Sequence, residues 1–469
     1  MKPIKKILIA NRGEIAVRII RAVREMDLIP VVVYSDVDAD SLPVRMAEEA
    51  YHIGPSPALE SYMNIDKIIE VAKRSHSNAI HPGYGFLAEN AEFARKVEEN
   101  GLIFIGPSHE SIATMGNKIV SRTIMSKAGV AVVPGALISI ENKNALFQEA
   151  ARIGFPLLLK ASVGGGGKGM RKVTCKSELE AAFDRAQSEA MSTFGNNTMY
   201  IEKFIENSHH IEIQILADSY GSVLCLGERE CSMQRRYQKI LEETPSPFLD
   251  DITRREMEKI AVVAARAVNY KNSGTVEFIV DSDRNFYFLE MNTRLQVEHS
   301  VTEMVTGIDL VKEQINIAMG KPLDFSQSDI KPQGAAIECR IYAEDPYNNF
   351  TPSPGEIMDY CSPCGDGVRI DTGVLGGCQV SIFYDPLISK LTTWGRNRSE
   401  VIKRMKRALC EYRIEGISTT IPYFLHILEN KEFLSGNYTT CLGEKFARDL
   451  VHTREVLETC APEGLQYAV

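Results

Sequence analysis

The sequence lacks the features that define several large classes of protein. No apolar run approaches the ~18 residues that a membrane-spanning helix requires, and Met1-Lys2-Pro3 leads straight into a strand-like segment without a signal-peptide core. The net charge of -9 lacks the basic excess that a surface for nucleic acid or anionic lipid needs. We therefore expect a cytoplasmic protein that binds neither nucleic acid nor a membrane.

Cysteines with disulfide or zinc spacing are also lacking. The ten cysteines are scattered and lie mostly inside apolar runs, as small buried side chains do under reducing conditions. Cys361 and Cys364 form a C-x-x-C, but neither a second pair nor a histidine with zinc spacing lies near them. This pattern favours a structural loop over a metal or redox site.

The N-terminal third alternates strands and helices, as a doubly wound α/β domain with a parallel sheet does. Apolar periodicity predicts strands at 7–10, 29–34, 79–81 and 102–105, and helices at 14–25, 65–74 and 91–99. The first turn, at 10–14, holds one glycine, so the dinucleotide fingerprint is missing and a nicotinamide dehydrogenase is disfavoured. The turn His81 to Phe86 follows the third strand, where such sheets place ligand loops.

A predicted β-hairpin between Gly274 and His299 carries a row of polar groups. Two apolar runs flank a polar turn, and period-2 spacing continues beyond the second run. Carboxylate and amide oxygens at this spacing suit one or two Mg²⁺ ions, although a solvated sheet face is the alternative. An extended backbone would place these residues on one side, with Glu277 in reach on the partner strand: Glu290, Asn292, Arg294, Gln296 and Glu298.

A glycine-rich loop follows a strand that ends near Lys160. Gly164 to Gly169 joins strand to strand and lacks the Ser or Thr of a Walker loop. We interpret it as a lid whose amides close over a polyphosphate, with Lys160 facing the phosphates, while a flexible hairpin stays the alternative. The polar run 228–239 is predicted as an exposed helix or loop. The chain after Pro332 is β-rich and closes with two helices.

Seven motifs occur in the order found in biotin carboxylases, which have the ATP-grasp fold. The sequence resembles this family from Lys6 to Leu442, and HPGYGFLAEN with EMNTRLQVEH is highly specific. The motifs are ANRGEIAVRIIRA, HPGYGFLAEN, MGNK, GGGGKGM, EKF, CSMQRRYQK and EMNTRLQVEH. The resemblance implies an N-terminal Rossmann-like domain (1–115), an ATP-grasp region (116–330) with a lid subdomain at about 132–203, a C-terminal biotin carboxylase domain (331–450) and a tail (451–469).

The resemblance also implies roles for residues at matching positions. Lys118 and Lys160 would bind the ATP phosphates, and Gly165, Gly166 and Gly167 would close over them. Adenine would be held by Glu202, Lys203 and Phe204. The ribose would be contacted by His210 and Gln234. Glu277, Glu290 and Asn292 would ligate two Mg²⁺ or Mn²⁺ ions. Lys239, Arg294, Gln296 and Val297 would hold bicarbonate, and Glu298 would remove its proton. Arg340 would stabilise the negative charge on the carboxyphosphate intermediate and on the biotin enolate, and Tyr84 would line the biotin pocket.

The implied reaction is the ATP- and bicarbonate-dependent carboxylation of biotin through carboxyphosphate. It is the first half-reaction of enzymes such as pyruvate carboxylase or acetyl-CoA carboxylase, the latter in fatty acid biosynthesis. No Met-Lys-Met biotinylation sequence is present, so biotin would lie on a separate carrier protein, and a separate carboxyltransferase would choose an acceptor that this sequence does not identify. Arg21, Glu25 and Arg369 match homodimer positions of the family, with solvated surface charges as the alternative.

Two departures and two rivals accompany this interpretation. Tyr237 stands where many members carry His, which puts a ribose contact in doubt, and Lys168 stands where Arg is also common. Another ATP-grasp ligase would share the phosphate lysines and metal carboxylates, but would not need Glu298 beside Arg294, or Arg340. A catalytically silent nucleotide-binding partner would need no base.

Overall fold

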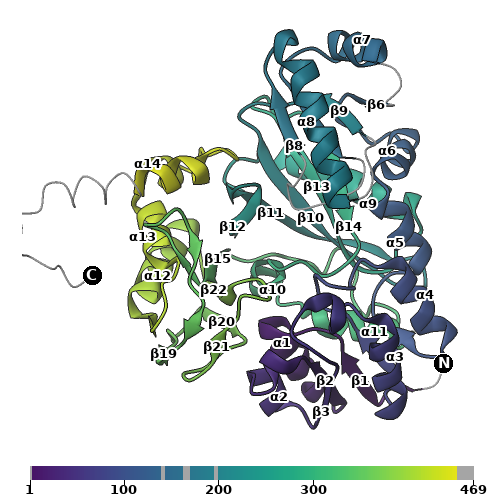
Figure 1. Cartoon of the computed structure of the whole chain (residues 1–469), viewed down its shortest axis with the longest axis vertical. Coiled ribbons are helices and arrows are strands. Elements are labelled where there is room, and N and C mark those ends of the chain that lie inside the picture. The colour runs from purple at the N-terminus through teal and green to yellow at the C-terminus, as the bar shows by residue number, and fades with distance from the viewer. Residues whose placement is uncertain (1–2, 139–142, 162–169, 195–198, 451–469) are drawn as a thin grey trace, which may run out of the picture.

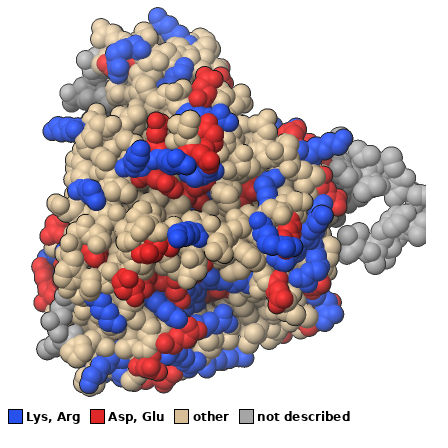
Figure 2. Space-filling view, turned by 180° about the vertical axis from the view of Figure 1, so that it is seen from behind, with Lys and Arg blue, Asp and Glu red and all other residues tan. Residues whose placement is uncertain are grey.

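The computed structural model describes residues 3–138, 143–161, 170–194 and 199–450 of the chain (Figure 1). A parallel sheet with its helices forms one end of the molecule, and a small sheet with two helices forms the other. A long antiparallel sheet and the C-terminal helices lie between and beside them. No helix in these described ranges is long and apolar enough to cross a membrane. On the face in Figure 2, basic and acidic side chains are interspersed.

The N-terminal sheet is five-stranded and parallel, with the order β3-β2-β1-β4-β5. Helix α1 packs on one face with Ile7 and Ile9, whereas α3 and α4 cluster with Leu8 and Val31 on the other. The predicted doubly wound domain is therefore confirmed. Its elements are β1 (Lys6–Ile9), α1 (Gly13–Glu25), β2 (Ile29–Tyr34), α2 (Leu42–Met46), β3 (Glu49–His52), α3 (Ile65–Arg74), β4 (Ala79–His81), α4 (Ala91–Glu99), β5 (Ile103–Phe104) and α5 (His109–Gly116).

An eight-stranded antiparallel sheet joins the centre of the chain to its C-terminal part, with the order β14-β13-β10-β11-β12-β15-β22-β20. Because β12 pairs with β15, residues on both sides of the predicted boundary at 330 share one sheet. Its strands are β10 (His209–Ala217), β11 (Val223–Arg235), β12 (Gln238–Thr244), β13 (Asn272–Val280), β14 (Phe286–Asn292), β15 (Ala335–Tyr342), β20 (Val368–Thr372) and β22 (Leu387–Gly395).

Apolar helices cover this sheet at two places. Ile211, Ile213 and Ile215 of β10 alternate with polar residues and pack against α9 (Asp251–Ala267). The C-terminal core joins β15 and β22 to α12 (Arg398–Glu411) and α13 (Ile421–Glu429). The polar side of β10 is also buried, so its side chains need partners within the protein.

A four-stranded sheet, β6-β9-β7-β8, and two helices occupy the stretch for which a lid subdomain is predicted, and we call this unit the lid subdomain. The glycines of the loop between β7 and β8, including Gly165, Gly166 and Gly167, lie outside the described residues. The elements here are α6 (Lys118–Lys127), β6 (Gly135–Ile138), α7 (Lys143–Ile153), β7 (Leu157–Ala161), β8 (Met170–Val173), α8 (Lys176–Phe194) and β9 (Met199–Lys203).

Short elements complete the C-terminal part. Two-residue and three-residue strands pair as β16-β17, β18-β21 and β19-β23 beside the large sheet. Both cysteines of the C-x-x-C are free and exposed, with Cys361 on β19. The elements are α10 (His299–Thr306), α11 (Leu310–Ala318), β16 (Glu344–Asp345), β17 (Thr351–Pro352), β18 (Gly355–Glu356), β19 (Asp359–Cys361), β21 (Gln379–Val380), β23 (Arg413–Glu415) and α14 (Lys431–Ser435).

The predicted hairpin is confirmed, but two local predictions are wrong. Strands β13 and β14 pair antiparallel with Glu277 opposite Glu290. The strand ends at Asn292, however, and residues 293–298 form an irregular segment with a turn at 297–298 before α10 begins. In the run 228–239, residues 228–235 belong to the strand β11 and are buried, since their polar side chains find partners that local polarity does not reveal. Only Arg236 and Tyr237 form an exposed turn, and β12 begins at Gln238.

Candidate functional site

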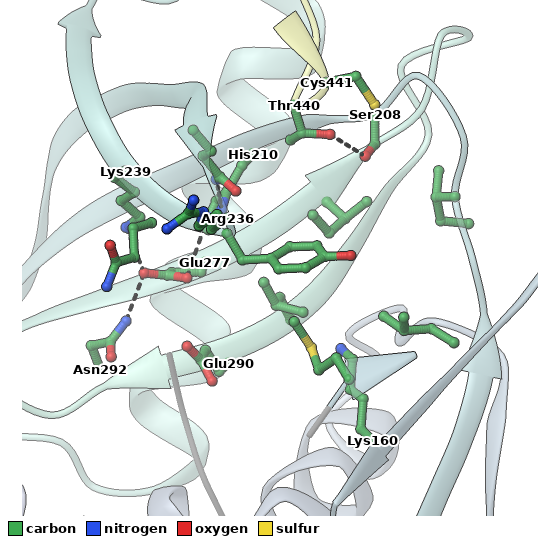
Figure 3. A pocket seen from close by; sticks show the side chains of 18 of the residues that line it. Lys160, Ser208, His210, Arg236, Lys239, Glu277, Glu290, Asn292, Thr440 and Cys441 are labelled. Atoms are coloured by element: carbon green, nitrogen blue, oxygen red, sulfur yellow. Dashed lines mark hydrogen bonds and ion pairs between the residues drawn. The ribbon is translucent and has the colours of Figure 1, made fainter. Parts of the chain in front are cut away.

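A cavity of about 780 Å³ opens between the eight-stranded sheet and the lid subdomain (Figure 3). Residues from β10, β12, β13 and β14 converge on it, and Arg340 reaches it from β15. The sequence-predicted residues that line it are Lys118, Lys160, Glu202, Lys203, Phe204, His210, Gln234, Lys239, Glu277, Glu290, Asn292, Arg294, Gln296, Val297, Glu298 and Arg340.

Lys239 lies at the centre of a buried group of carboxylates. Its Nζ donates to Oε2 of Glu212 at 2.6 Å, Oε1 of Glu277 at 2.8 Å and Oε1 of Glu298 at 2.7 Å. Burial lowers the pKa of Lys239, but these three carboxylates outweigh it and hold the pKa well above the usual value. Lys239 is therefore a permanent cation, and its three N–H donors are all engaged.

Glu277 accepts four hydrogen bonds, one of them from Lys239. Asn292 Nδ2 and Gln296 Nε2 donate to Oε1 at 2.7 and 3.1 Å, and His210 Nε2 donates to Oε2 at 2.8 Å. Gln234 Nε2 donates to Nδ1 of His210 at 2.8 Å, which fixes the tautomer that faces Glu277. Burial raises the pKa of Glu277, but Lys239 and His210 outweigh it, so this carboxylate stays ionised.

Glu298 is fully buried between two cations. Besides Lys239, Arg340 Nη2 donates to Oε2 of Glu298 at 2.9 Å and also pairs with Glu242. Burial raises the pKa of Glu298, but Lys239, Arg340 and Arg229 outweigh it and hold the pKa well below its usual range. The cations therefore keep Glu298 ionised and able to accept a proton, although the lowered pKa makes it only a moderate base.

Glu290 is the carboxylate most available for a cation. It lies opposite Glu277 across the hairpin, and no hydrogen-bond or ion-pair partner contacts it within the part of the chain that the structure describes. Burial, followed by the Glu277 charge, raises the pKa of Glu290, while Lys118 opposes the rise. Two carboxylates and the Asn292 amide fit the oxygen donors that Mg²⁺ or Mn²⁺ prefers.

Arg294 is held flat against one wall of the cavity. Its Nε donates to Oε2 of Glu89 at 2.8 Å, and its Nη1 and Nη2 donate to Oε1 of Gln296 at 2.9 Å and Oδ1 of Asn292 at 3.2 Å. Glu89 also accepts from the backbone N–H of Thr293 at 3.1 Å. Glu89 therefore fixes both the backbone and the guanidinium of this turn segment.

The lid side of the cavity carries the predicted nucleotide residues. Lys160 Nζ lies 2.5 Å from Oε1 of Glu202, and Arg122 Nη1 lies 3.6 Å from Oε2 of the same carboxylate. Lys203 Nζ donates to the carbonyl of Phe155 at 2.6 Å, so this ammonium is tied to lid backbone. Burial lowers the pKa of Lys118 at the start of α6, and Glu290 opposes that change.

Three family models match the chain in sequence order. They are the biotin carboxylase N-terminal domain over residues 3–112, the ATP-binding domain of the carbamoyl-phosphate synthase L chain over 117–326, and the biotin carboxylase C-terminal domain over 338–444. Biotin carboxylase 1 of Bacillus subtilis is 54% identical over 94% of this chain and 99% of its own. The chain belongs to the biotin carboxylase family. The biotin carboxylase of Nostoc sp. is 52% identical over 93% of this chain and 97% of its own.

Solved structures agree with this membership. The biotin carboxylase domain dimer of Hydrogenobacter thermophilus 2-oxoglutarate carboxylase, in complex with MgADP, ADP and bicarbonate, has a TM-score of 0.92 and 45% identity over 96% of this chain and 99% of its own. Biotin carboxylase from Campylobacter jejuni has a TM-score of 0.91 and 46% identity, covering 94% of this chain and 99% of that one. The predicted fold class and the predicted activity class, an ATP-dependent carboxylating ligase, are confirmed.

Several site residues of this biotin carboxylase were missed by sequence reasoning. Glu212 stands two residues after His210 on β10, so period-2 spacing was a signal that could have found it. Arg229 is fully buried and ties Glu212 to Gln214, with its Nη1 2.7 Å from Oε1 of Gln214. Glu242 and Glu89 had no local signal, because their roles depend on strand pairing and on a contact made across the chain.

Four predicted residues lie away from the main cavity. Tyr84 is half-buried, and its ring centroid lies 5.8 Å from the Nζ of Lys390. Arg21, Glu25 and Arg369 line a separate cavity of about 310 Å³. This geometry places the three predicted dimer residues together on one surface, and their role as an interface stays a prediction.

Proposed function

We propose that this chain carboxylates biotin in an ATP- and bicarbonate-dependent reaction, with Glu298 as the base. The observation that carries the proposal is the fully buried Glu298 carboxylate, which lies 2.7 Å from Lys239 Nζ and 2.9 Å from Arg340 Nη2. This arrangement lies in the same cavity as the phosphate lysines and the metal carboxylates. A general ATP-grasp ligase or a silent nucleotide-binding partner has no need of it.

The nucleotide would bind at the lid side. Lys118 and Lys160 would contact the phosphates, and the amides of Gly165, Gly166 and Gly167 would close over them. Adenine would lie against Glu202, Lys203 and Phe204, with His210 and Gln234 at the ribose. Glu277, Glu290 and Asn292 would hold Mg²⁺ or Mn²⁺, and such ions neutralise phosphoryl oxygens during transfer.

Bicarbonate would bind against Lys239, Arg294 and the segment of Gln296 and Val297. Glu298 would take the bicarbonate proton, and a carbonate oxygen would then attack the γ-phosphorus, which releases ADP and forms carboxyphosphate. Because Glu298 has a lowered pKa, it is ionised and ready, although only a moderate base. Carboxyphosphate would then break down to CO₂ and phosphate, and the released phosphate would take the ureido N–H proton of biotin. Arg340 would stabilise the resulting enolate, which attacks CO₂, with biotin entering near Tyr84.

The chain would work as the biotin carboxylase subunit of a cytoplasmic biotin-dependent carboxylase. Biotin would arrive on a separate carrier protein, and a separate carboxyltransferase would choose among acceptors such as acetyl-CoA, pyruvate or 2-oxoglutarate. A role in fatty acid biosynthesis stays one of these possibilities. Homodimerisation would use Arg21, Glu25 and Arg369, which line one exposed cavity. The domain boundaries at 115, 330 and 450 likewise stay predictions.

The test measures ATP cleavage by purified protein in Mg²⁺, with and without bicarbonate and free biotin. We expect slow cleavage that requires bicarbonate, acceleration by biotin, and formation of carboxybiotin. If cleavage is as fast in carefully degassed buffer without bicarbonate, carbonate is not the phosphoryl acceptor and the general ligase becomes the better explanation.

A further inference from the structure

Lys390 on β22 is a fully buried lysine outside the proposed chemistry. It lies opposite Arg340 on β15 and opposite Asp371 on β20, so the three side chains form a row across the sheet. Cross-strand partners on one face lie within reach of each other. Lys390 is therefore a direct neighbour of the residue proposed to stabilise the enolate.

The ammonium of Lys390 reaches the chain just before the proposed base. Its Nζ donates to the carbonyl oxygen of Val297 at 2.7 Å, and Val297 immediately precedes Glu298. Residues 293–298 lie outside any strand ladder, so side chains must hold the backbone there. Lys390 fixes the carbonyl side of the Val297–Glu298 peptide, while Lys239 and Arg340 hold the Glu298 carboxylate.

Carboxylates from two other parts of the chain keep Lys390 charged and in place. Oε1 of Glu14 on α1 lies 3.4 Å from Nζ, and Oδ2 of Asp371 lies 4.0 Å from it. Burial lowers the pKa of Lys390, but Glu14, Glu338 and Asp371 outweigh it, so the group stays an ammonium. Burial raises the pKa of Glu14 to about 8 although Lys390 opposes the rise, so Asp371, whose pKa is lowered, is the partner that stays ionised. A buried cation with these partners holds its position more rigidly than a solvated one.

The start of α1 also approaches the C-terminal part closely. A Cβ at Gly373 would lie 2.5 Å from the carbonyl carbon of Gly13 and 2.6 Å from the backbone N of Glu14, so only glycine permits this approach. This approach places Glu14 directly beside β20 and β22. The N-terminal domain thus contributes, through Glu14 and Lys390, to the position of the Val297 carbonyl.

We propose that Lys390 is a positioning residue for the carboxylation reaction, which fixes the backbone just before Glu298 through the Val297 carbonyl, whereas Lys239 and Arg340 hold the Glu298 carboxylate. The inference rests on the proposed role of Glu298 as the base. Without the ammonium, the turn segment loses its backbone anchor and Glu298 moves relative to bound bicarbonate. Lys390 does not line the cavity that Glu298 and Arg340 line, so it acts through the backbone and not on substrate.

The test compares the wild type with Lys390→Met in ATP cleavage and in MgADP binding by calorimetry. We expect bicarbonate-dependent kcat to fall by about 10²-fold, as misplacement of a reacting group by about 1 Å does. The KM for MgATP and the Kd for MgADP should stay within about twofold, because Lys390 contacts the backbone of Val297 and no residue proposed to bind the nucleotide. If Lys390→Met leaves buried charge that prevents folding, the charge-balanced Glu14→Gln/Lys390→Met variant takes its place.

Arg398→Met is the matched structural control. Arg398 pairs with Glu243 at 2.6 Å and donates to the carbonyl of Phe433 at 2.8 Å, so it also anchors backbone, but away from the cavity. We expect it to lower the free energy of unfolding with little change in kcat. A folded Lys390 variant with wild-type kcat, or with kcat and MgADP affinity lost in proportion, would overturn the inference. Wild-type enzyme without bicarbonate-dependent cleavage would instead refute the proposed function.

Discussion

Replacement of Glu298 by Gln tests the base with little change of shape. Oε1 accepts from Lys239 at 2.7 Å and Oε2 from Arg340 at 2.9 Å. A glutamine oxygen can serve one of these cations, whereas its NH₂ faces a second donor and cannot accept a proton. We expect bicarbonate-dependent ATP cleavage to fall by about 10²- to 10⁴-fold, the span for loss of a general base. At 1.36 kcal/mol per tenfold, this is about 2.7–5.4 kcal/mol of barrier.

Arg340→Ser should separate the two half-reactions. Lys239 and Arg229 still face Glu298 in this variant, so the carboxylate stays ionised and ATP cleavage should change little. Carboxybiotin formation should fall by about 10²-fold, or ~3 kcal/mol, the scale of losing one donor to a developing oxyanion. Phosphate would then appear without carboxybiotin.

The assay measures phosphate and carboxybiotin on each variant in the same reaction, with MgADP affinity as the check on folding. Full ATP cleavage in Glu298→Gln would remove Glu298 as the base. Equal losses of both products in Arg340→Ser would show that Arg340 serves the first step instead of the second.

Three further predictions follow from other parts of the chain. Glu290→Gln should raise the Mg²⁺ concentration for half-maximal activity at least about tenfold, whereas Asp283→Asn in the exposed hairpin turn should not; equal Mg²⁺ titrations would exclude Glu290 as a ligand. Burial lowers the pKa of His81 to about 3, so between pH ~6 and ~3 only the unfolded chain binds this proton. The free energy of unfolding should therefore fall by up to about 1.4 kcal/mol for each pH unit of acidification, and His81→Asn should reduce this slope in denaturant titrations. Arg21→Glu should turn a dimer into a monomer in sedimentation, because it adds an anion beside Glu25; an unchanged dimer would place the interface elsewhere.

Local pattern predicted the elements of this fold well where one face is apolar. The hairpin of β13 and β14 and the alternation of the N-terminal domain followed from periodicity, since burial and strand pairing select the same residues. The two-residue spacing alone predicted that Glu290 and Asn292 lie on one side of the strand, and both line the cavity. Arg294, Gln296 and Glu298 reach it by a different route, through an irregular segment that the spacing did not predict.

Buried polar strands were beyond local pattern. The run 228–239 looks solvated, yet Arg229 is fully buried because Glu212, Gln214, Thr275 and Thr302 accept from it. These acceptors lie on three other elements. A short stretch of sequence around Arg229 therefore does not show the partners that offset the free-energy cost of burying its charge. The sequence did not predict a role for Glu242 for the same reason, since its partner Arg340 lies on β15.

The engaged state of Lys239 constrains how substrates can enter. All three of its N–H donors are used by Glu212, Glu277 and Glu298, so bicarbonate can accept from Lys239 only if one carboxylate gives up its bond. Glu212 is also held by Arg229, and Glu298 must stay beside the bound anion to act as its base. Glu277 is the remaining choice, and it is one of the residues proposed to hold a metal ion. Binding of the nucleotide with its metal ion should therefore increase the affinity for bicarbonate. When Glu277 binds the metal ion it gives up its bond to Lys239, and one N–H donor of Lys239 becomes available to bicarbonate.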